Sequence, residues 1–173
     1  NEQVEQMRLS ATKSILQHND TIIVASVSAI YGLGDPTSYQ EMSISLDVGQ
    51  KKDQRDIVRE LATMQYRRHQ YSFERGLYRV RGDVIDIFPA ESEELAIRIE
   101  LFDDEVESIV RFDPLTGEQK EVLEEITIYP KTHYVSRKDR MPGVIAEVKK
   151  DLEAQLLVFK SENKLLEAQR LKQ

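Results

Sequence analysis

The stretch YRVRGDVIDIFPAESEE, residues 78–94, carries the clearest strand pattern in the chain. Polar and apolar side chains alternate on both sides of Gly82, and a period of two is typical of strands that bury one face. A glycine between two such runs favours a tight turn. We therefore predict an antiparallel hairpin with strands over 77–81 and 83–88.

Alternation also predicts which side chains of the hairpin point away from the core. Tyr78 and Val80 take the packed face of the first strand, so Arg79 and Arg81 share the opposite face. The same argument places two charged residues of a later strand on that polar side: Arg98 and Glu100. The sheet is thus expected to have an apolar side that packs on a helix and a charged side that is left open.

Further patterns on both sides of the hairpin predict an α+β domain of roughly 100 residues. Alternating runs bounded by turn residues predict strands over 44–48, 95–102, 105–112 and 121–129. Helical spacing predicts a short helix near 36–42 and an amphipathic helix over 53–65, with Asp53 as its N-cap. The predicted fold is a central antiparallel sheet with packed helices.

The N-terminal segment follows a different pattern. Residues 3–18 predict a helix whose apolar face is formed by side chains at three- and four-residue spacings: Val4, Met7, Ala11 and Ile15. The β-branched run 21–25 predicts a strand buried on both faces, as in a parallel sheet. Such a strand needs sheet neighbours, and turn-rich residues 32–36 separate it from the strands that follow.

The C-terminal residues 137–173 predict a long helical segment. Apolar side chains recur there at helical spacings: Val144, Val148, Leu152, Leu156, Phe159 and Leu166. The pattern runs to the last residue without a stop signal. Together with the strand 21–25 that lacks neighbours, this leads us to expect a piece of a longer protein.

Composition excludes several classes of function. The chain has 173 residues, no cysteine and a formal net charge of -7. The absence of cysteine removes disulfides and thiolate sites and fits a cytoplasmic protein. No apolar run approaches the roughly 20 residues that cross a membrane. The acidic balance disfavours non-specific nucleic-acid binding by the chain as a whole.

The residues offer little catalytic chemistry. A phosphate-cradling loop of the form G-x-x-x-x-G-K-[ST] is not found, and no serine lies in a hydrolase motif. The three histidines, His18, His69 and His133, lack metal-ligand spacing. We therefore predict no catalytic residue, no metal site and no cofactor in this chain.

Charge segregation is the most informative feature of the middle of the chain. Residues 67–81 are rich in arginine: Arg67, Arg68, Arg75, Arg79 and Arg81. Residues 83–107 are rich in acid, with Arg98 as their one basic side chain. Arginine pairs in bidentate fashion with carboxylates or phosphates and is enriched at interface hot spots. Charge alone leaves three interpretations open: a solvated face with internal ion pairs, a phosphate-binding face, or a protein-docking face.

Strings spread over the whole chain, in the same order, resemble the UvrB family of the bacterial UvrABC excinuclease. One of these strings is residues 78–94, quoted above. The others are EQMRLSATKSIL (5–16), ASVSAIYGLGDP (25–36), FDPLTGE (112–118), IYPKTHYV (128–135) and ENKLLEAQRLKQ (162–173). The transcription-repair coupling factor carries a similar middle module. Its likeness does not extend to 25–36 or 162–173, so the UvrB family is preferred.

The resemblance implies a division of the chain into three parts. Residues 1–35 correspond to a fragment of a helicase-like lobe called domain 1a, 36–135 to domain 2, and 136–173 to the helical start of domain 1b. The family's phosphate-binding loop and DE-x-H motif belong outside this span. ATP and magnesium, damaged DNA and UvrC are therefore expected of the full-length protein, which is an ATPase of the excinuclease, and not of this chain.

The resemblance also implies a partner for the charged side of the sheet. Domain 2 of the family docks UvrA, and the matching positions are Arg68, Arg79, Arg81, Arg98 and Glu100, with Arg75 nearby. Arg8, Ser26 and Ser28 fall where the helicase lobe of the family contacts a DNA strand. In this chain, simple turn or cap chemistry is the favoured explanation of the serines, because the rest of the DNA channel is missing. Direct nucleic-acid binding through residues 67–81 is the alternative function.

Overall fold

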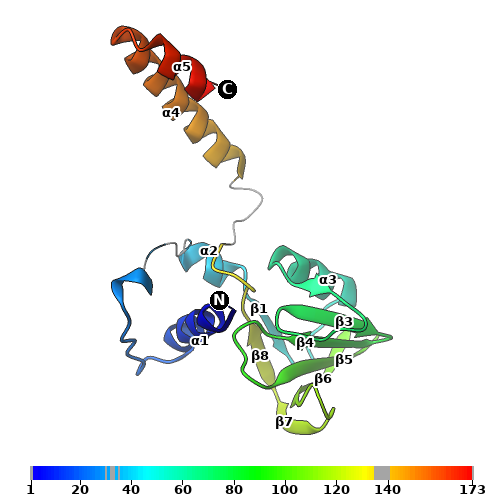
Figure 1. The fold of residues 1–173 in the computed structure, drawn as a ribbon. Helices are drawn as coiled ribbons and strands as arrows, with labels where there is room; N and C mark the ends of the chain where they lie inside the picture. Colours follow the sequence, from blue (N-terminus) through cyan, green and yellow to red (C-terminus); the bar gives the residue numbers. More distant parts are fainter. Residues whose placement is uncertain (1, 30, 32–33, 35, 135–140, 173) are drawn as a thin grey trace. The chain divides into compact units, whose positions relative to one another are not determined.

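A computed structural model describes residues 2–29, 31, 34, 36–134 and 141–172 (Figure 1). The chain divides into two compact units, Asn1–Val135 and Ser136–Gln173. The predicted boundary residues 32, 33, 35 and 135–137 lie outside the described residues. No helix in the described part of the chain combines the length and apolar character needed to span a membrane.

The first unit contains a six-stranded sheet in the order β2-β3-β4-β5-β6-β7. Its strands are β2 (Arg67–Arg68), β3 (Leu77–Arg81), β4 (Val84–Phe88), β5 (Ala96–Phe102), β6 (Glu105–Phe112) and β7 (Gln119–Leu123). All neighbours pair antiparallel except β2 and β3, which are parallel. The predicted hairpin is confirmed: Arg81 pairs with Val84 and Gly82 adopts a positive φ of 58° in the turn.

The main core lies between one face of this sheet and helix α3 (Gln54–Thr63). Asp53 begins the helix as predicted, because its side chain accepts a hydrogen bond from the amide of Arg55. Ile57 and Leu61 are fully buried against apolar side chains of the sheet such as Ile85 and Ile99. The apolar side predicted from alternation is therefore the side that packs on the helix.

The strand predicted over 121–129 is two strands in two sheets. β7 ends at Leu123, and β8 (Glu125–Ile128) pairs antiparallel with β1 (Ile44–Asp47) in a separate two-stranded sheet. Ile44 and Ile128 are buried in the main core. Alternation continues through the junction, so the sequence pattern does not reveal that the pairing partner changes.

The N-terminal segment differs from prediction in two ways. Helix α1 (Glu2–Gln17) forms, but Val4, Met7 and Ile15 are exposed, whereas Gln6 and Leu9 are buried. Leu9 packs with Tyr39, Ala90 and Tyr129 in a second core cluster, beside helix α2 (Pro36–Glu41). The helix therefore meets the rest of the unit through a face that hydrophobic spacing does not identify.

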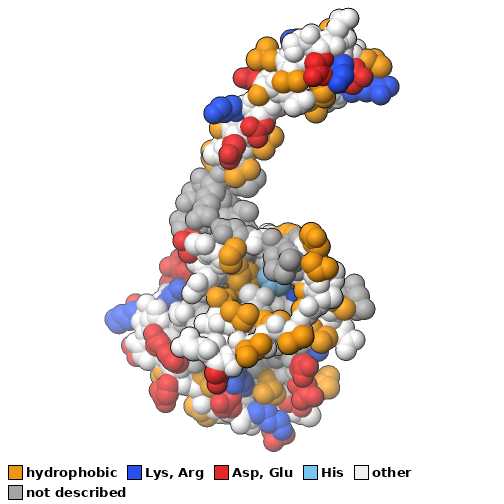
Figure 2. Space-filling model, turned by 90° about the vertical axis from the view of Figure 1, so that its left-hand side faces the viewer, with side chains coloured by type: hydrophobic (Ala, Val, Ile, Leu, Met, Phe, Trp, Pro, Cys, Tyr) orange, Lys and Arg blue, Asp and Glu red, His pale blue; other side chains and the backbone are white. Residues whose placement is uncertain are grey.

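The predicted strand 21–25 does not form. The segment has no regular structure, and Ile22 and Val24 are 89% and 94% exposed before the short 3-10 helix Val27–Ala29. No described strand pairs with it, and an isolated strand has no stability of its own. Figure 2 looks onto this side of the unit, where hydrophobic side chains gather with few charges among them.

The second unit is a helical hairpin of α4 (Met141–Ser161) and α5 (Leu165–Lys172). The predicted long helical segment over 137–173 therefore breaks near Asn163, and its ends at 137–140 and 173 lie outside the described residues. Asn163 has a φ of 59°, and the amide of Lys164 bonds to the carbonyl of Phe159. Asparagine tolerates this left-handed conformation, which ends α4.

Candidate functional site

Three charged side chains form a row across β3, β4 and β5. Arg79 pairs with Asp86 in the β3–β4 register, and Asp86 pairs with Arg98 in the β4–β5 register. Paired residues of an antiparallel ladder project to the same side, so all three lie on the face opposite α3. We call this side of the sheet the arginine face; it comprises Arg79, Arg81, Asp86, Arg98 and Glu100.

Asp86 is the acceptor for both arginines of the row. Nε of Arg79 donates to Oδ2 of Asp86 at 2.8 Å, and Nε of Arg98 donates to Oδ1 at 2.7 Å. Nη2 of Arg98 donates to Oδ2 at 3.2 Å. Hydrogen bonding to Asp86 raises the pKa of Arg98 above its usual value. The Asp86 residue is 2% exposed, so the two guanidinium groups, and not water, compensate the charge of its carboxylate.

Aromatic rings lie beneath the two guanidinium groups. Arg79 lies 4.4 Å from the ring centroid of Phe73, and Arg98 lies 4.6 Å from that of Phe112. These two rings are stacked, with centroids 6.1 Å apart. Together with Phe88 and Ala96 they form a small core on the arginine face. The prediction of a fully open charged side is therefore wrong, because this cluster covers part of it.

Arg81 and Glu100 complete the arginine face on its exposed side. Arg81 is exposed, and its side chain has no hydrogen bond or ion pair within the described residues. Glu100 accepts a hydrogen bond from the hydroxyl of Ser108 at 3.0 Å, across the β5–β6 ladder. Alternation predicted correctly that Arg79, Arg81, Arg98 and Glu100 share one face.

Two other arginines predicted for the site, Arg68 and Arg75, do not belong to the arginine face. Arg68 pairs with Tyr78 in the parallel β2–β3 register, and Arg67 pairs with Leu77. Side chains of paired residues point to the same side, so Arg68 projects on the Tyr78 side. The prediction that Arg68 shares the face of Arg79 is wrong. Arg75 donates to the carbonyls of Ser92 and Glu93 and thereby fixes the loop after β4.

The predicted DNA-contacting residues lie close together at the N-terminal segment. Nη2 of Arg8 donates to the carbonyl of Ser28 at 3.2 Å. The hydroxyls of Ser26 and Ser28 are 2.7 Å apart. The residues thus form one polar cluster, although the sequence separates Arg8 from the serines by a helix end and a loop.

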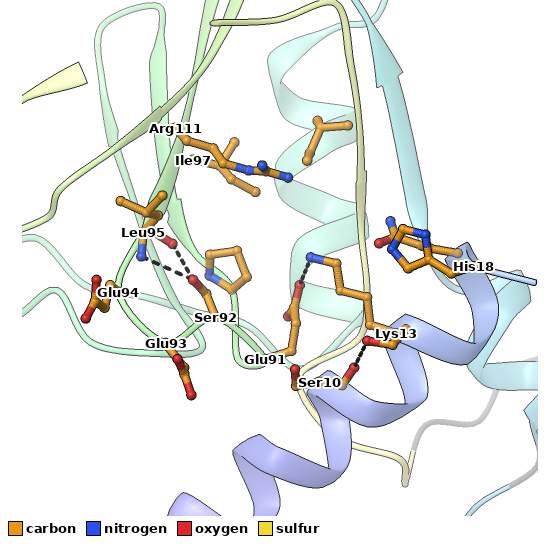
Figure 3. Close-up of a pocket in the computed structure, with 14 residues that line it drawn as sticks. Ser10, Lys13, His18, Glu91, Ser92, Glu93, Glu94, Leu95, Ile97 and Arg111 are labelled. Atoms are coloured by element: carbon orange, nitrogen blue, oxygen red, sulfur yellow. Dashed lines mark hydrogen bonds and ion pairs between the residues drawn. The ribbon is translucent and has the colours of Figure 1, made fainter. Parts of the chain in front are cut away.

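A hollow of about 420 Å³ lies between α1 and the loop that follows β4 (Figure 3). Lys13 of α1 and Glu91 of the loop point toward each other there, and their charged atoms are 3.0 Å apart. The side-chain amide of Gln6 also donates to the backbone carbonyl of Glu91. Glu91 is 5% exposed, and its Oε2 has no hydrogen-bond partner among the described residues. These contacts attach α1 to the sheet-containing part of the unit.

Sequence reasoning missed several residues of these sites: Phe73, Asp86, Phe112, Gln6, Lys13 and Glu91. The alternation of the strand is sufficient to predict Asp86, because this residue lies between Ile85 and Ile87 and must therefore point to the polar side of β4. The others depend on loop positions and on long-range packing, for which the sequence offers no periodic signal. Among the described residues, no group of histidine, aspartate and glutamate is arranged to hold a metal ion.

Comparison with known families identifies the class of domain. The family model of the UvrB interaction domain matches residues 44–134, and that of the UvrB third helical domain matches residues 139–173. The first match covers both sheets and the whole arginine face. The second covers the helical hairpin. The chain thus matches an interaction domain followed by a helical domain.

Individual relatives agree with this result. The chain is 58% identical to UvrABC system protein B of Legionella pneumophila over all 173 residues. It is 57% identical to the protein of that name from Actinobacillus pleuropneumoniae and 56% to that from Haemophilus influenzae. The chain belongs to the UvrB family. It spans about a quarter, 26%, of the length of these curated relatives.

Proposed function

We propose that this chain is the UvrA-docking part of a nucleotide excision repair protein and that the arginine face forms the contact. The observation that carries the proposal is the row Arg79–Asp86–Arg98, with exposed Arg81 beside it, on the sheet face opposite α3, which none of the described helices of the unit covers. The match to a family described as an interaction domain supports it.

The chemistry of the arginine face favours a protein surface that carries carboxylates. Guanidinium groups pair with carboxylates in a fixed planar geometry, and arginines stacked on rings lose little freedom on binding. Complementary charge steers association and sets orientation more than it adds affinity. We therefore expect a salt-sensitive complex, whose association slows as ionic strength rises.

A titration of the chain with UvrA tests the docking face. The double variant Arg79→Ala/Arg81→Ala is expected to weaken binding by about tenfold or more. Its matched control is Arg55→Ala/Arg59→Ala, which removes the same charge from exposed positions of α3 on the other side of the sheet. Unchanged affinity in the first variant contradicts the proposal.

The variant Arg81→Glu separates docking from folding. Arg79 contributes to the packing of the unit, whereas the side chain of Arg81 is exposed and makes no hydrogen bond or ion pair in the described chain. Charge reversal at Arg81 should therefore weaken UvrA binding and leave the thermal midpoint unchanged. Salt-dependent DNA binding by the chain, abolished by the same variant, would favour the nucleic-acid alternative instead.

For the whole protein we propose an ATP-dependent role in damage verification within the excinuclease. In that protein residues 1–35 belong to helicase lobe 1a, 36–135 to domain 2 and 136–173 to domain 1b. ATP, magnesium, damaged DNA and UvrC are engaged by the whole protein. This chain alone is expected to show no ATP turnover, because hydrolysis requires a phosphate loop and a magnesium-holding carboxylate.

A second proposal concerns the polar cluster of Arg8, Ser26 and Ser28. Arginine and serine hydroxyls commonly contact phosphate oxygens, and the three side chains lie together here. In the whole protein, Arg8→Ala should weaken DNA binding without affecting UvrA binding. Equal DNA affinity for variant and wild type would leave these residues a purely structural role.

A further inference from the structure

Asp86 occupies a place that no docking partner can reach. The residue is 2% exposed, and its carboxylate accepts hydrogen bonds from Arg79 and from Arg98. We propose that Asp86 is the positioning residue of the arginine face: it holds both guanidinium groups in one orientation, with their outer N–H groups directed to a partner. This inference rests on the proposed docking function.

The pattern of donors supports this role. Arg79 uses Nε for Asp86, and Arg98 uses Nε and Nη2. Within the described residues, the Nη atoms of Arg79 and Nη1 of Arg98 have no hydrogen-bond acceptor. The inner edge of each guanidinium group is therefore fixed, and outer N–H groups remain for carboxylates of another protein.

Aromatic packing restricts the remaining freedom of the two side chains. A hydrogen bond at Nε permits rotation about its own axis, but a ring beneath the guanidinium plane opposes that rotation. Phe73 supplies this ring for Arg79 and Phe112 supplies it for Arg98. The side chains of Arg79 and Arg98 are only 16% and 30% exposed, so they are ordered before any partner arrives. Such order lowers the entropic cost of binding.

Positioning and simple electrostatics predict opposite results for one substitution. Asp86→Asn removes a negative charge from a basic face, so charge alone predicts tighter binding to an acidic partner. If Asp86 positions the arginines, the variant loses the charge-assisted hydrogen bonds and binds more weakly despite its higher positive charge. We expect the dissociation constant for UvrA to rise by about tenfold.

Asp83→Asn is the matched control. Asp83 lies in the exposed turn between β3 and β4, and its side chain makes no hydrogen bond or ion pair within the described residues. The substitution therefore changes the charge equally without removing a hydrogen bond to an arginine. Its UvrA affinity should equal or slightly exceed that of wild type. Arg98→Lys adds an independent test, because lysine keeps the charge but cannot bridge both carboxylate oxygens as the fork does.

A measurement on the wild-type chain avoids any dependence on folding of the variants. In proton–nitrogen spectra, the Nε–H groups of Arg79 and Arg98 should exchange with water about tenfold more slowly than that of Arg81, which lacks an acceptor. Exchange of all three at the same rate would overturn the positioning role, whether or not Asp86→Asn folds.

The outcomes separate this inference from the docking proposal. If Arg79→Ala/Arg81→Ala weakens UvrA binding while Asp86→Asn leaves it unchanged or strengthens it, docking stands and positioning fails. If the spectra show protected Nε–H groups but no variant of the arginine face affects binding, the docking proposal fails and Asp86 has only a structural role. Weaker binding by both variants, with Asp83→Asn as wild type, supports both.

Discussion

The ammonium group of Lys13 lies 3.0 Å from Oε1 of Glu91 and joins two segments that are 78 positions apart in the sequence (Figure 3). Glu91 is nearly buried, whereas the Lys13 side chain is 23% exposed. Because water solvates the Glu91 carboxylate poorly, this carboxylate depends on the Lys13 ammonium group, and the pair stabilises the attachment of α1.

Lys13→Ala should lower the free energy of unfolding by about 2 kcal/mol, because it leaves a buried carboxylate without its cation. The loss is not larger because solvent screens the partly exposed lysine side of the pair. Urea unfolding followed by tyrosine fluorescence measures this change. All seven tyrosines lie within residues 31–134, so the signal reports on the first unit. Lys120→Ala, which removes an exposed pair with Glu118, is the control and should leave the midpoint unchanged.

The N-cap of α3 offers a second stability test. Asp53→Ala should destabilise the first unit by about 1 kcal/mol, because the amide of Arg55 loses its acceptor. Asp53→Asn should retain most of that stability, since the asparagine side chain is an equally good cap. An equal loss in both variants would show that charge near the helix start, and not the cap hydrogen bond, stabilises α3.

Truncation of two isoleucines compares the stability contribution of the core with that of segment 21–25, where the predicted strand does not form. Ile99→Ala is expected to cost about 2–5 kcal/mol, because the side chain is fully buried between sheet and helix. Ile22→Ala should have no measurable effect on unfolding of this chain, because that side chain is 89% exposed. A large loss at Ile22 would indicate that residues 21–25 pack against a surface in solution.

His133 predicts a pH dependence of stability. Its imidazole lies 2.9 Å from the hydroxyl of Thr12 and stacks on Tyr39, and burial lowers its pKa below the ordinary 6.5. The unfolded chain therefore takes up a proton near pH 6.5, where the folded chain does not. The free energy of unfolding should fall as the pH drops below 6.5.

His133→Gln removes that contribution. Burial is the largest cause of the lowered pKa of His133. The charges of Glu5 and Arg8 act on this pKa in opposite directions, Glu5 raising it and Arg8 lowering it. The difference in unfolding free energy between pH 7.5 and pH 5.5 should be smaller in His133→Gln than in wild type. His18→Gln controls for removal of an imidazole as such. An unchanged pH dependence in His133→Gln would contradict the assignment.

Local sequence pattern determined most elements of the first unit. Strict alternation around Gly82 specified the hairpin of β3 and β4, because a one-residue shift would expose every apolar side chain. The same alternation placed Arg79, Arg81, Arg98 and Glu100 on one side. The N-cap at Asp53 followed from side-chain chemistry confined to three residues.

Tertiary structure alone decided which of these elements meet and what each charge contacts. The face of α1 that packs, the change of sheet between β7 and β8, and the side taken by Arg68 all depend on partners distant in sequence. The run 21–25 has the composition of a buried strand but lacks a described neighbour to pair with. Asp86 shows both contributions: alternation directs it to the polar side, and only the folded sheet brings Arg79 and Arg98 together around it.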